Sequence, residues 1–150
     1  MRNTLRHQET IDYLVKIVWQ SMANKYNQLV IEHGFTQAIG YLLINIDETE
    51  GTTVSHAAQL LGLKSTSLSR MLNQLEESGL IYRESNTGDK RSVKIYLTAS
   101  GIEKRQLARK VVKEFNNYLN AHISEKEKEL LTGILNKINK LTANYDPGQV

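Results

Sequence analysis

The sequence predicts a mainly α-helical domain with one short β-hairpin, and three observations carry this prediction. Over most of the 150 residues, apolar residues recur every three or four positions, which is the period of an amphipathic helix. The single proline, Pro147, lies close to the C-terminus, so almost the whole chain is free to be helical. Two short stretches between positions 80 and 97 instead alternate and are rich in β-branched and aromatic residues, as strands are.

Composition narrows the class of protein. A chain of 150 residues with 40% hydrophobic and 23% charged residues is ordinary for one soluble globular domain with a core. The sequence lacks an apolar run long enough to span a bilayer and an N-terminal signal peptide, so we expect a cytoplasmic protein that does not bind membranes. The absence of cysteine excludes disulfides, thiolate catalysis and cysteine-ligated zinc. A net charge of +3 permits nucleic-acid binding without arguing for it.

The N-terminal third predicts two helices. Spacings of three and four between apolar residues predict a long first helix from about Gln8 to Ile31. Gly34 breaks this pattern, and Thr36 is a suitable N-cap for a second helix. Because that helix is apolar over much of its surface, we expect it at the centre of the domain. Asp47 to Thr52 then reads as a polar loop.

A helix-turn-helix pattern follows. Thr53 can cap a short helix over Val54–Leu61, a turn at Gly62 comes next, and a further helix begins near Lys64 or Ser65. Gly79 ends this helix as a left-handed cap would. Its apolar stripe consists of Leu68, Leu72 and Leu75, flanked by Met71. Short hydroxyl and amide groups around one arginine occupy the opposite face, which suits contact with base edges and phosphates: Thr66, Ser67, Arg70, Asn73 and Gln74.

The predicted hairpin comes directly after this helix and completes a winged helix-turn-helix over residues 35–98. Its strands are Leu80–Glu84 and Val93–Leu97, and the loop between them carries Asp89, Lys90 and Arg91. A wing of this kind typically lies along the DNA backbone, and an arginine at its tip can enter the minor groove. The basic residues from the second helix of the motif to the second strand are Lys64, Arg70, Arg83, Lys90, Arg91 and Lys94.

Two long amphipathic helices are predicted at the C-terminal end. Thr98 can cap one that reaches about His122, and Ser124 with Glu127 forms a capping box for the other. The last helix carries a wide apolar stripe: Leu130, Leu131, Ile134, Leu135, Ile138 and Leu141. Residues 1–34 and 99–145 together expose more apolar surface than a small three-helix core with its hairpin wing can cover, so we expect a second copy to cover it. Residues 146–150 read as a loose tail of the single domain.

The chain resembles the MarR family of bacterial transcriptional regulators over nearly its whole length. The resemblance is carried by Leu68-Ser69-Arg70-Met71-Leu72, Leu75-Glu76, Gly79-Leu80-Ile81, the wing triplet Asp89-Lys90-Arg91 and the strand end Leu97-Thr98. It implies a homodimer whose terminal helices interlock, with each winged helix placed on half of a near-palindromic double-stranded DNA operator. Many members are repressors. The implied DNA-binding residues are Ser65, Thr66, Ser67, Ser69, Arg70, Asn73, Gln74, Lys90 and Arg91.

The resemblance also gives Asp89 the role of bracing the wing through a salt bridge and Arg91 that of the minor-groove residue. Arg91 could instead be a solvated loop charge. For Arg70 the alternative is a surface salt bridge with Glu77, but residues seven positions apart on one helix are too distant for it, so DNA contact is favoured. Many relatives bind small aromatic or lipophilic compounds between the dimerisation helices and the DNA-binding lobe. The residues that could line such a pocket here are Trp19, Met22, Tyr26 and Tyr41, which could equally be core.

Other chemistry has no candidate residues in the sequence. The four histidines are dispersed without metal-ligand spacing, and no catalytic triad, phosphate-binding glycine loop or paired carboxylates can be proposed. We therefore predict no metal, no cofactor and no enzymatic activity. The alternative to a DNA-binding regulator is a winged-helix module that binds protein instead of DNA.

Overall fold

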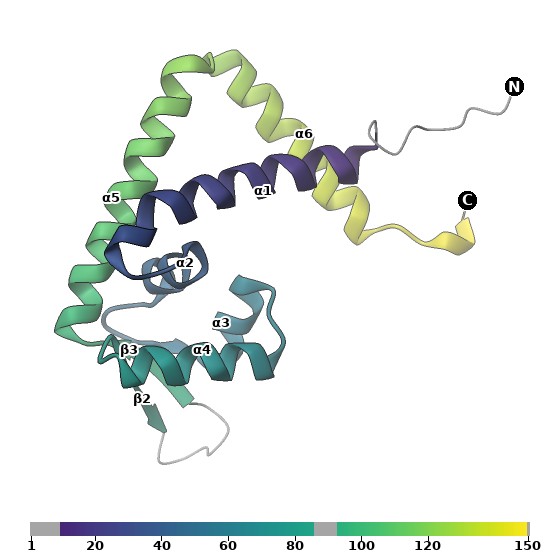
Figure 1. Ribbon diagram of the computed structural model, residues 1–150. Coiled ribbons are helices and arrows are strands. Elements are labelled where there is room, and N and C mark those ends of the chain that lie inside the picture. Colours follow the sequence, from purple (N-terminus) through teal and green to yellow (C-terminus); the bar gives the residue numbers. More distant parts are fainter. Residues whose placement is uncertain (1–9, 86–92, 150) are drawn as a thin grey trace, which may run out of the picture. The chain divides into compact units, whose positions relative to one another are not determined.

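The computed structural model describes residues 10–85 and 93–149 and confirms a mainly helical winged-helix fold (Figure 1). The chain divides into two compact units, Met1–Val112 and Lys113–Val150, with the boundary inside the fifth α-helix. The elements are, in order, α1 (Ile11–Val30), η2 (Ile31–His33), α2 (Gln37–Asn45), β1 (Thr52–Thr53), α3 (Val54–Leu61), α4 (Ser65–Glu77), β2 (Ile81–Ser85), β3 (Val93–Leu97), α5 (Ala99–His122), α6 (Glu125–Ala143) and η3 (Pro147–Gln149).

Side-chain caps begin four of the helices where the sequence places them. The hydroxyl of Thr36 accepts a hydrogen bond from the Ile39 amide at 3.3 Å, and that of Thr53 accepts one from the His56 amide at 3.2 Å. The Thr98 hydroxyl likewise accepts from the amide of Gly101, at 3.0 Å. At the start of α6, Ser124 and Glu127 form the predicted reciprocal capping box. Each cap satisfies an amide that the helix itself leaves without an acceptor.

The C-terminus of α4 is closed by Gly79, as predicted. Gly79 has a φ of +67°, a left-handed conformation that a side chain would strain. The amide of Gly79 donates to the carbonyl of Glu76 and the amide of Leu80 donates to that of Leu75, both at 2.9 Å. These two bonds turn the chain sharply from α4 into β2.

One apolar core lies beneath α4 and joins the helix-turn-helix to the sheet. The inner face of α4 is fully buried at Leu68 and nearly so at Leu72 and Leu75. The other members of this core are Leu42, Leu43, Ile46, Ala57, Ile81 and Ile95. Because α2 contributes Leu42 and Leu43 to this core, and its C-cap residue Ile46 also belongs to it, the prediction that this helix is central is confirmed.

The sheet has three strands rather than the predicted two, in the order β1-β3-β2. The extra strand is the pair Thr52 and Thr53, which is antiparallel to β3 with Thr52 opposite Ile95. The expected polar loop therefore ends one residue earlier than predicted. Thr52 is buried, and its hydroxyl accepts from the Asp47 amide at 3.0 Å. A two-residue strand has no alternation to detect, and only tertiary contact with β3 makes it one.

The two chain ends differ slightly from the predictions. α1 is confirmed over Ile11–Val30, and its expected start at Gln8 lies outside the described residues. The expected loose tail contains a short 3₁₀ turn, Pro147–Gln149. None of the helices in the described parts of the chain is both long and apolar enough to cross a bilayer.

Two helices expose apolar side chains in the single chain. On α1, Ile11 is 60% exposed and Val18 57% exposed, with Leu14, Val15 and Trp19 also exposed. On α6 the predicted stripe is exposed at Leu130, Leu131, Ile134, Leu135 and Leu141. Scattered apolar residues are normal on surfaces, but continuous stripes of this kind mark surfaces that bind a partner.

Candidate nucleic-acid interface

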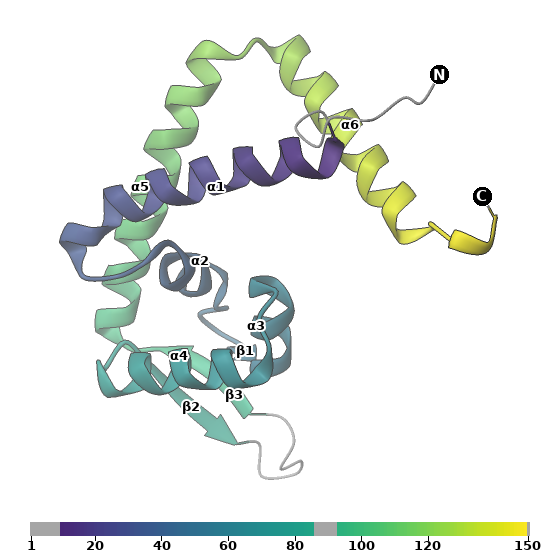
Figure 2. The same cartoon turned by 45° about the vertical axis from the view of Figure 1, so that its right-hand side comes forward.

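The outer face of α4 presents the predicted polar residues. Leu68, Leu72 and Leu75 point into the core, so the opposite side of the helix must face away from it. All seven predicted α4 residues are exposed: Ser65, Thr66, Ser67, Ser69, Arg70, Asn73 and Gln74. α4 lies beside β2 in both views of the chain (Figures 1 and 2). The structure thus brings the hydroxyl and amide groups together on one accessible helix surface next to the wing strands.

Arg70 is the cation of this surface. In the described part of the chain Arg70 forms no ion pair, with Glu77 or with any other carboxylate. An exposed guanidinium outside an ion pair can donate to phosphate or to the edge of guanine.

The N-terminus of α4 is also open to an anion. Lys64 occupies the N-cap position, and in the described part of the chain its side chain makes no capping hydrogen bond. The first turn, which starts at Ser65, carries no acidic residue in this described helix. First-turn amides without internal acceptors and a nearby lysine favour negative charge, such as a phosphate.

A hydrogen-bonded network ties α4 to β2 through Arg83. The Nε of Arg83 donates to Glu76 Oε2 at 3.0 Å, its backbone amide donates to Glu76 Oε1 at 3.2 Å, and its Nη2 also contacts Oε2. The same Nη2 donates to the Asn73 Oδ1 at 2.9 Å. The positive charge of Arg83, one of the basic residues between Lys64 and Lys94, is therefore neutralised by Glu76.

Electrostatics around this network follow from the same contacts. The hydrogen bond from the Arg83 side chain lowers the pKa of Glu76 below its usual value, against a smaller opposing effect of desolvation. Glu76 therefore stays ionised at neutral pH. Lys94, another of the predicted basic residues, donates from its Nζ to the Glu50 carbonyl at 2.8 Å.

The tip of the wing lies outside the described residues. β2 and β3 pair in the register Tyr82 opposite Tyr96 and Glu84 opposite Lys94, so the hairpin itself is confirmed. Asp89, Lys90 and Arg91 all fall within residues 86–92, so their roles as wing brace and DNA contacts stay predictions.

All four residues predicted to line an effector pocket line a cavity of about 200 Å³. Trp19, Met22 and Tyr26 of α1 and Tyr41 of α2 share it with Val30, Phe35, Gln37, Gly40, Ile44, Ala108, Val111 and Val112. Of the described residues that line this cavity, none carries a charge. Such an apolar, aromatic wall suits a small aromatic or lipophilic molecule.

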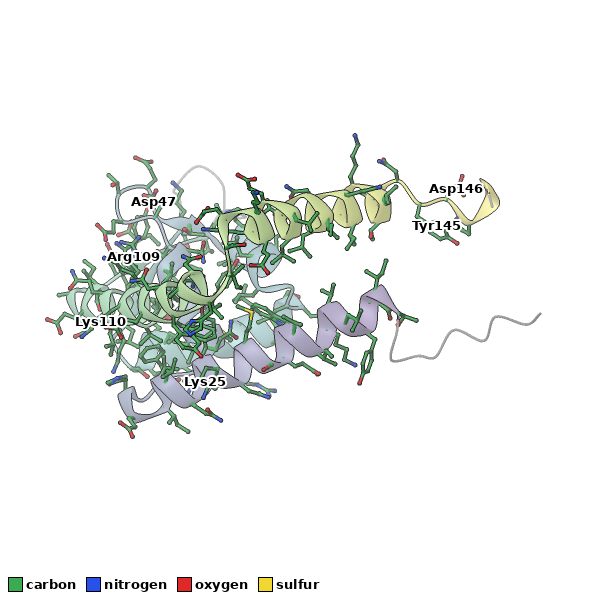
Figure 3. The ribbon with its side chains drawn as sticks, turned by 90° about the horizontal axis from the view of Figure 1, so that it is seen from above. Lys25, Asp47, Arg109, Lys110, Tyr145 and Asp146 are labelled. Atoms are coloured by element: carbon green, nitrogen blue, oxygen red, sulfur yellow. The ribbon has the colours of Figure 1, made fainter. Side chains whose placement is uncertain are left out.

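Arg105 of α5 is buried, which the sequence pattern did not predict. Arg105 is 4% exposed, donates from Nη1 to the Ile46 carbonyl at 3.0 Å and pairs through Nη2 with Glu48. Burial, reinforced by nearby Arg109, lowers the pKa of Arg105, and Asp47 acts against this. Arg105, Asp47 and Arg109 line one polar hollow. Asp47 and Arg109 are labelled in Figure 3. An arginine within an amphipathic helix reads as solvated unless its buried acceptor is known.

Comparison with known proteins agrees with this geometry. Residues 36–93 match the model of the MarR family. Over 104 residues the chain is 32% identical to the organic hydroperoxide resistance transcriptional regulator of Bacillus subtilis, covering 67% of this chain and 71% of the relative. The chain belongs to the MarR family. It is a transcriptional regulator of that family.

Two further relatives extend the comparison. A Thauera aromatica protein, named as a transcriptional regulator for the hcr operon, is 27% identical over 105 residues; the match spans 70% of this MarR-family chain but only 63% of that relative. Among solved structures, the S. aureus MepR–DNA complex matches with a TM-score of 0.80 and 28% identity, covering 87% of this chain and 96% of MepR. The fold of this chain is thus similar to that of MepR in its complex with DNA.

Proposed function

We propose that this MarR-family chain is a homodimeric repressor that binds a near-palindromic DNA operator and is released by a small aromatic or lipophilic compound. The observation that carries the DNA-binding part is the outer face of α4. There, exposed hydroxyl, amide and guanidinium groups stand on a helix whose other side is fixed in the core. A helix presented in this way fits the major groove, where such groups read base edges.

Contacts to the DNA backbone complete the proposed interface. The first turn of α4, with Lys64 beside it, is suited to one phosphate, and Arg91 at the wing is proposed to enter the minor groove. Because phosphate contacts release counterions, the affinity for duplex DNA should fall steeply as salt concentration rises.

Replacing Arg70 or Arg91 by alanine should each lower operator affinity about tenfold while the dimer stays intact. Each loses one charge-assisted contact, and loss of a phosphate contact also reduces the slope of log affinity against log salt by about one. Fluorescence anisotropy with a duplex selected from the host genome, repeated at several salt concentrations, measures both quantities. Lys126→Ala, an exposed cation on α6, is the matched control and should bind as the wild type does.

The two possible failures of this experiment have different meanings. If both arginine variants bind the operator as tightly as the wild type, neither Arg70 nor Arg91 contacts the DNA. A wild-type protein that shows no salt-sensitive binding to any duplex would instead favour the alternative, a winged-helix module that binds protein.

The effector part of the proposal rests on the aromatic cavity. Its lining residues come from α1, from Phe35 just before α2, from α2 and from the part of α5 that ends at Val112, all within the first compact unit. A ligand placed there would contact both the DNA-binding lobe and the helices proposed for dimerisation. It could therefore shift the equilibrium between lobe arrangements by binding one of them better.

Trp19 is the only tryptophan of the chain, so its fluorescence reports directly on this cavity. We expect 1-naphthol to change Trp19 emission and to lower operator affinity about tenfold, a typical coupling between two sites. The charged analogue 1-naphthoate should bind more weakly, because the cavity offers no charged partner. Ala108→Leu fills the cavity and should abolish both effects, whereas Ala99→Leu, exposed on the same helix, should not. Equal responses of the two variants would contradict the assignment.

A further inference from the structure

Gln37 places a carboxamide in the wall of the aromatic cavity. It is the first residue of α2, and positions 37, 40, 41 and 44 share one face of this helix because they lie at i, i+3, i+4 and i+7. All four line the cavity, the other three being Gly40, Tyr41 and Ile44. Among the described residues around the cavity, Gln37 is the only one with a side-chain amide. It stands where an apolar residue would complete the wall.

The backbone of Gln37 is fixed, whereas its side chain is not engaged. Its backbone amide donates to Oδ1 of Asn27 on α1 at 2.8 Å, and the hydroxyl of the preceding residue, Thr36, caps α2. In the described part of the chain the carboxamide itself makes no hydrogen bond, although Gln37 is partly buried. A polar group is thus held at one place in the cavity with its donors and its acceptor available to a ligand.

The chemistry of this group favours a ligand that carries a hydroxyl. The oxygen of a carboxamide accepts hydrogen bonds and its NH₂ group donates them, while a hydroxyl does both. A bare hydrocarbon placed against Gln37 would remove the amide from water and return no hydrogen bond. A ligand with a hydroxyl at this point replaces a hydrogen bond to water, and its rings can still pack on the apolar wall.

Three other side chains in the wall have polar atoms, at the edges of their aromatic rings: Trp19, Tyr26 and Tyr41. Trp19 is 54% exposed and Tyr41 is 40% exposed, so both are more open to water than Gln37. Where water competes for a polar group, a hydrogen bond from a ligand adds less affinity. Gln37 is therefore better placed than these two residues to recognise a hydroxyl.

We propose that Gln37 determines the specificity of the cavity by selecting neutral hydroxy-aromatic compounds over hydrocarbons of the same ring structure. The hydroxyl would bond to the carboxamide, and the rings would lie against the aromatic and aliphatic side chains. This inference rests on the proposed effector site and adds the chemical class of the ligand to it.

The dissociation constants of 1-naphthol and naphthalene test the proposal, since the two compounds differ only by the hydroxyl. Equilibrium dialysis measures both constants without an optical signal from the protein. The ratio of the naphthalene constant to the 1-naphthol constant should fall about fivefold to tenfold in Gln37→Met, as expected for the loss of one hydrogen bond. Methionine keeps the length of the side chain and leaves the backbone bond to Asn27 in place. A merely structural change in the cavity would weaken both compounds alike and leave the ratio unchanged.

Matched variants separate Gln37 from its neighbours. Gln20→Met is the control for the substitution, because Gln20 is exposed on α1 and does not line the cavity, and it should keep the wild-type ratio. Tyr26→Phe and Tyr41→Phe remove the two hydroxyls of the wall and should also keep it. Thermal unfolding identifies a Gln37→Met protein that fails to fold, in which case Gln37→Ala provides the same measurement.

Two results would overturn the inference: an unchanged ratio in a folded Gln37 variant, or a fall in the ratio confined to one of the phenylalanine variants. If the wild type binds neither compound, the proposed effector site fails, and this inference fails with it.

Discussion

Replacing Ile134 by aspartate should convert the proposed homodimer into a monomer and lower operator affinity by roughly 100-fold or more. Ile134 lies in the middle of α6 and is 47% exposed in the single chain, between Leu130, Leu131 and Leu141 of the same stripe. The free energy needed to bury a carboxylate in an apolar interface exceeds the free energy gained from the contacts at this position, so the two copies should separate.

The expected loss of affinity comes from the number of half-sites bound together. In a dimer the second winged helix binds at a high effective concentration once the first has docked, which commonly raises affinity by about 10²–10⁴-fold. A monomer retains only the contacts to one half-site. Sedimentation velocity measures the oligomeric state, and anisotropy on full and half operators measures the affinity.

Lys137→Asp provides the control for this experiment, because Lys137 is exposed on the same helix but is not part of the apolar stripe. It should remain dimeric and lose little affinity. If the Ile134→Asp protein is also dimeric at micromolar concentration, then α6 does not form the interface between copies.

Replacing Arg105 by methionine should lower the free energy of unfolding by about 2 kcal/mol. Methionine fills part of the space of the arginine stem but cannot donate to the Ile46 carbonyl at the end of α2. Glu48 returns to water at little cost because it is already 52% exposed, so most of the loss comes from the carbonyl. The loss is smaller than for a fully buried ion pair because the substitution leaves no unpaired charge in the core.

Urea denaturation at a fixed protomer concentration measures this loss, since the unfolding of a dimer depends on concentration. Arg109 lies one helical turn after Arg105, lines the same polar hollow and is exposed. Its replacement by methionine should change the free energy of unfolding by less than about 0.5 kcal/mol. An Arg105→Met protein as stable as this control would show that Arg105 does not hold α5 to the end of α2.

The helices of this protein were predictable because their signals are local. The threonine caps at Thr36 and Thr53 and the capping box at Ser124 lie within three residues of the amides they satisfy. The apolar stripe of α4 is likewise a matter of spacing along one helix. These features require no knowledge of what lies opposite them, so the sequence carried the helix-turn-helix and its exposed polar face.

The features that the sequence missed all join residues far apart in the chain. Thr52 becomes a strand only because it lies opposite Ile95, and Arg105 is buried only because it meets the Ile46 carbonyl. Arg83 reads as a free base beside a wing until Glu76 and Asn73 are found around it. Each depends on a contact between residues at least seven positions apart in the sequence, and the periodicity of the sequence does not reveal such contacts.

The helix order, the caps and the residues that α4 presents follow from local periodicity and hydrogen bonding, so they can be predicted without the fold. The tertiary structure alone decided what those residues can do. It gathered Trp19, Met22, Tyr26 and Tyr41 around one cavity and turned the Asn73 oxygen towards Arg83. The physical reason is that the donors and acceptors left available to a ligand are those that packing and partner contacts have not already used.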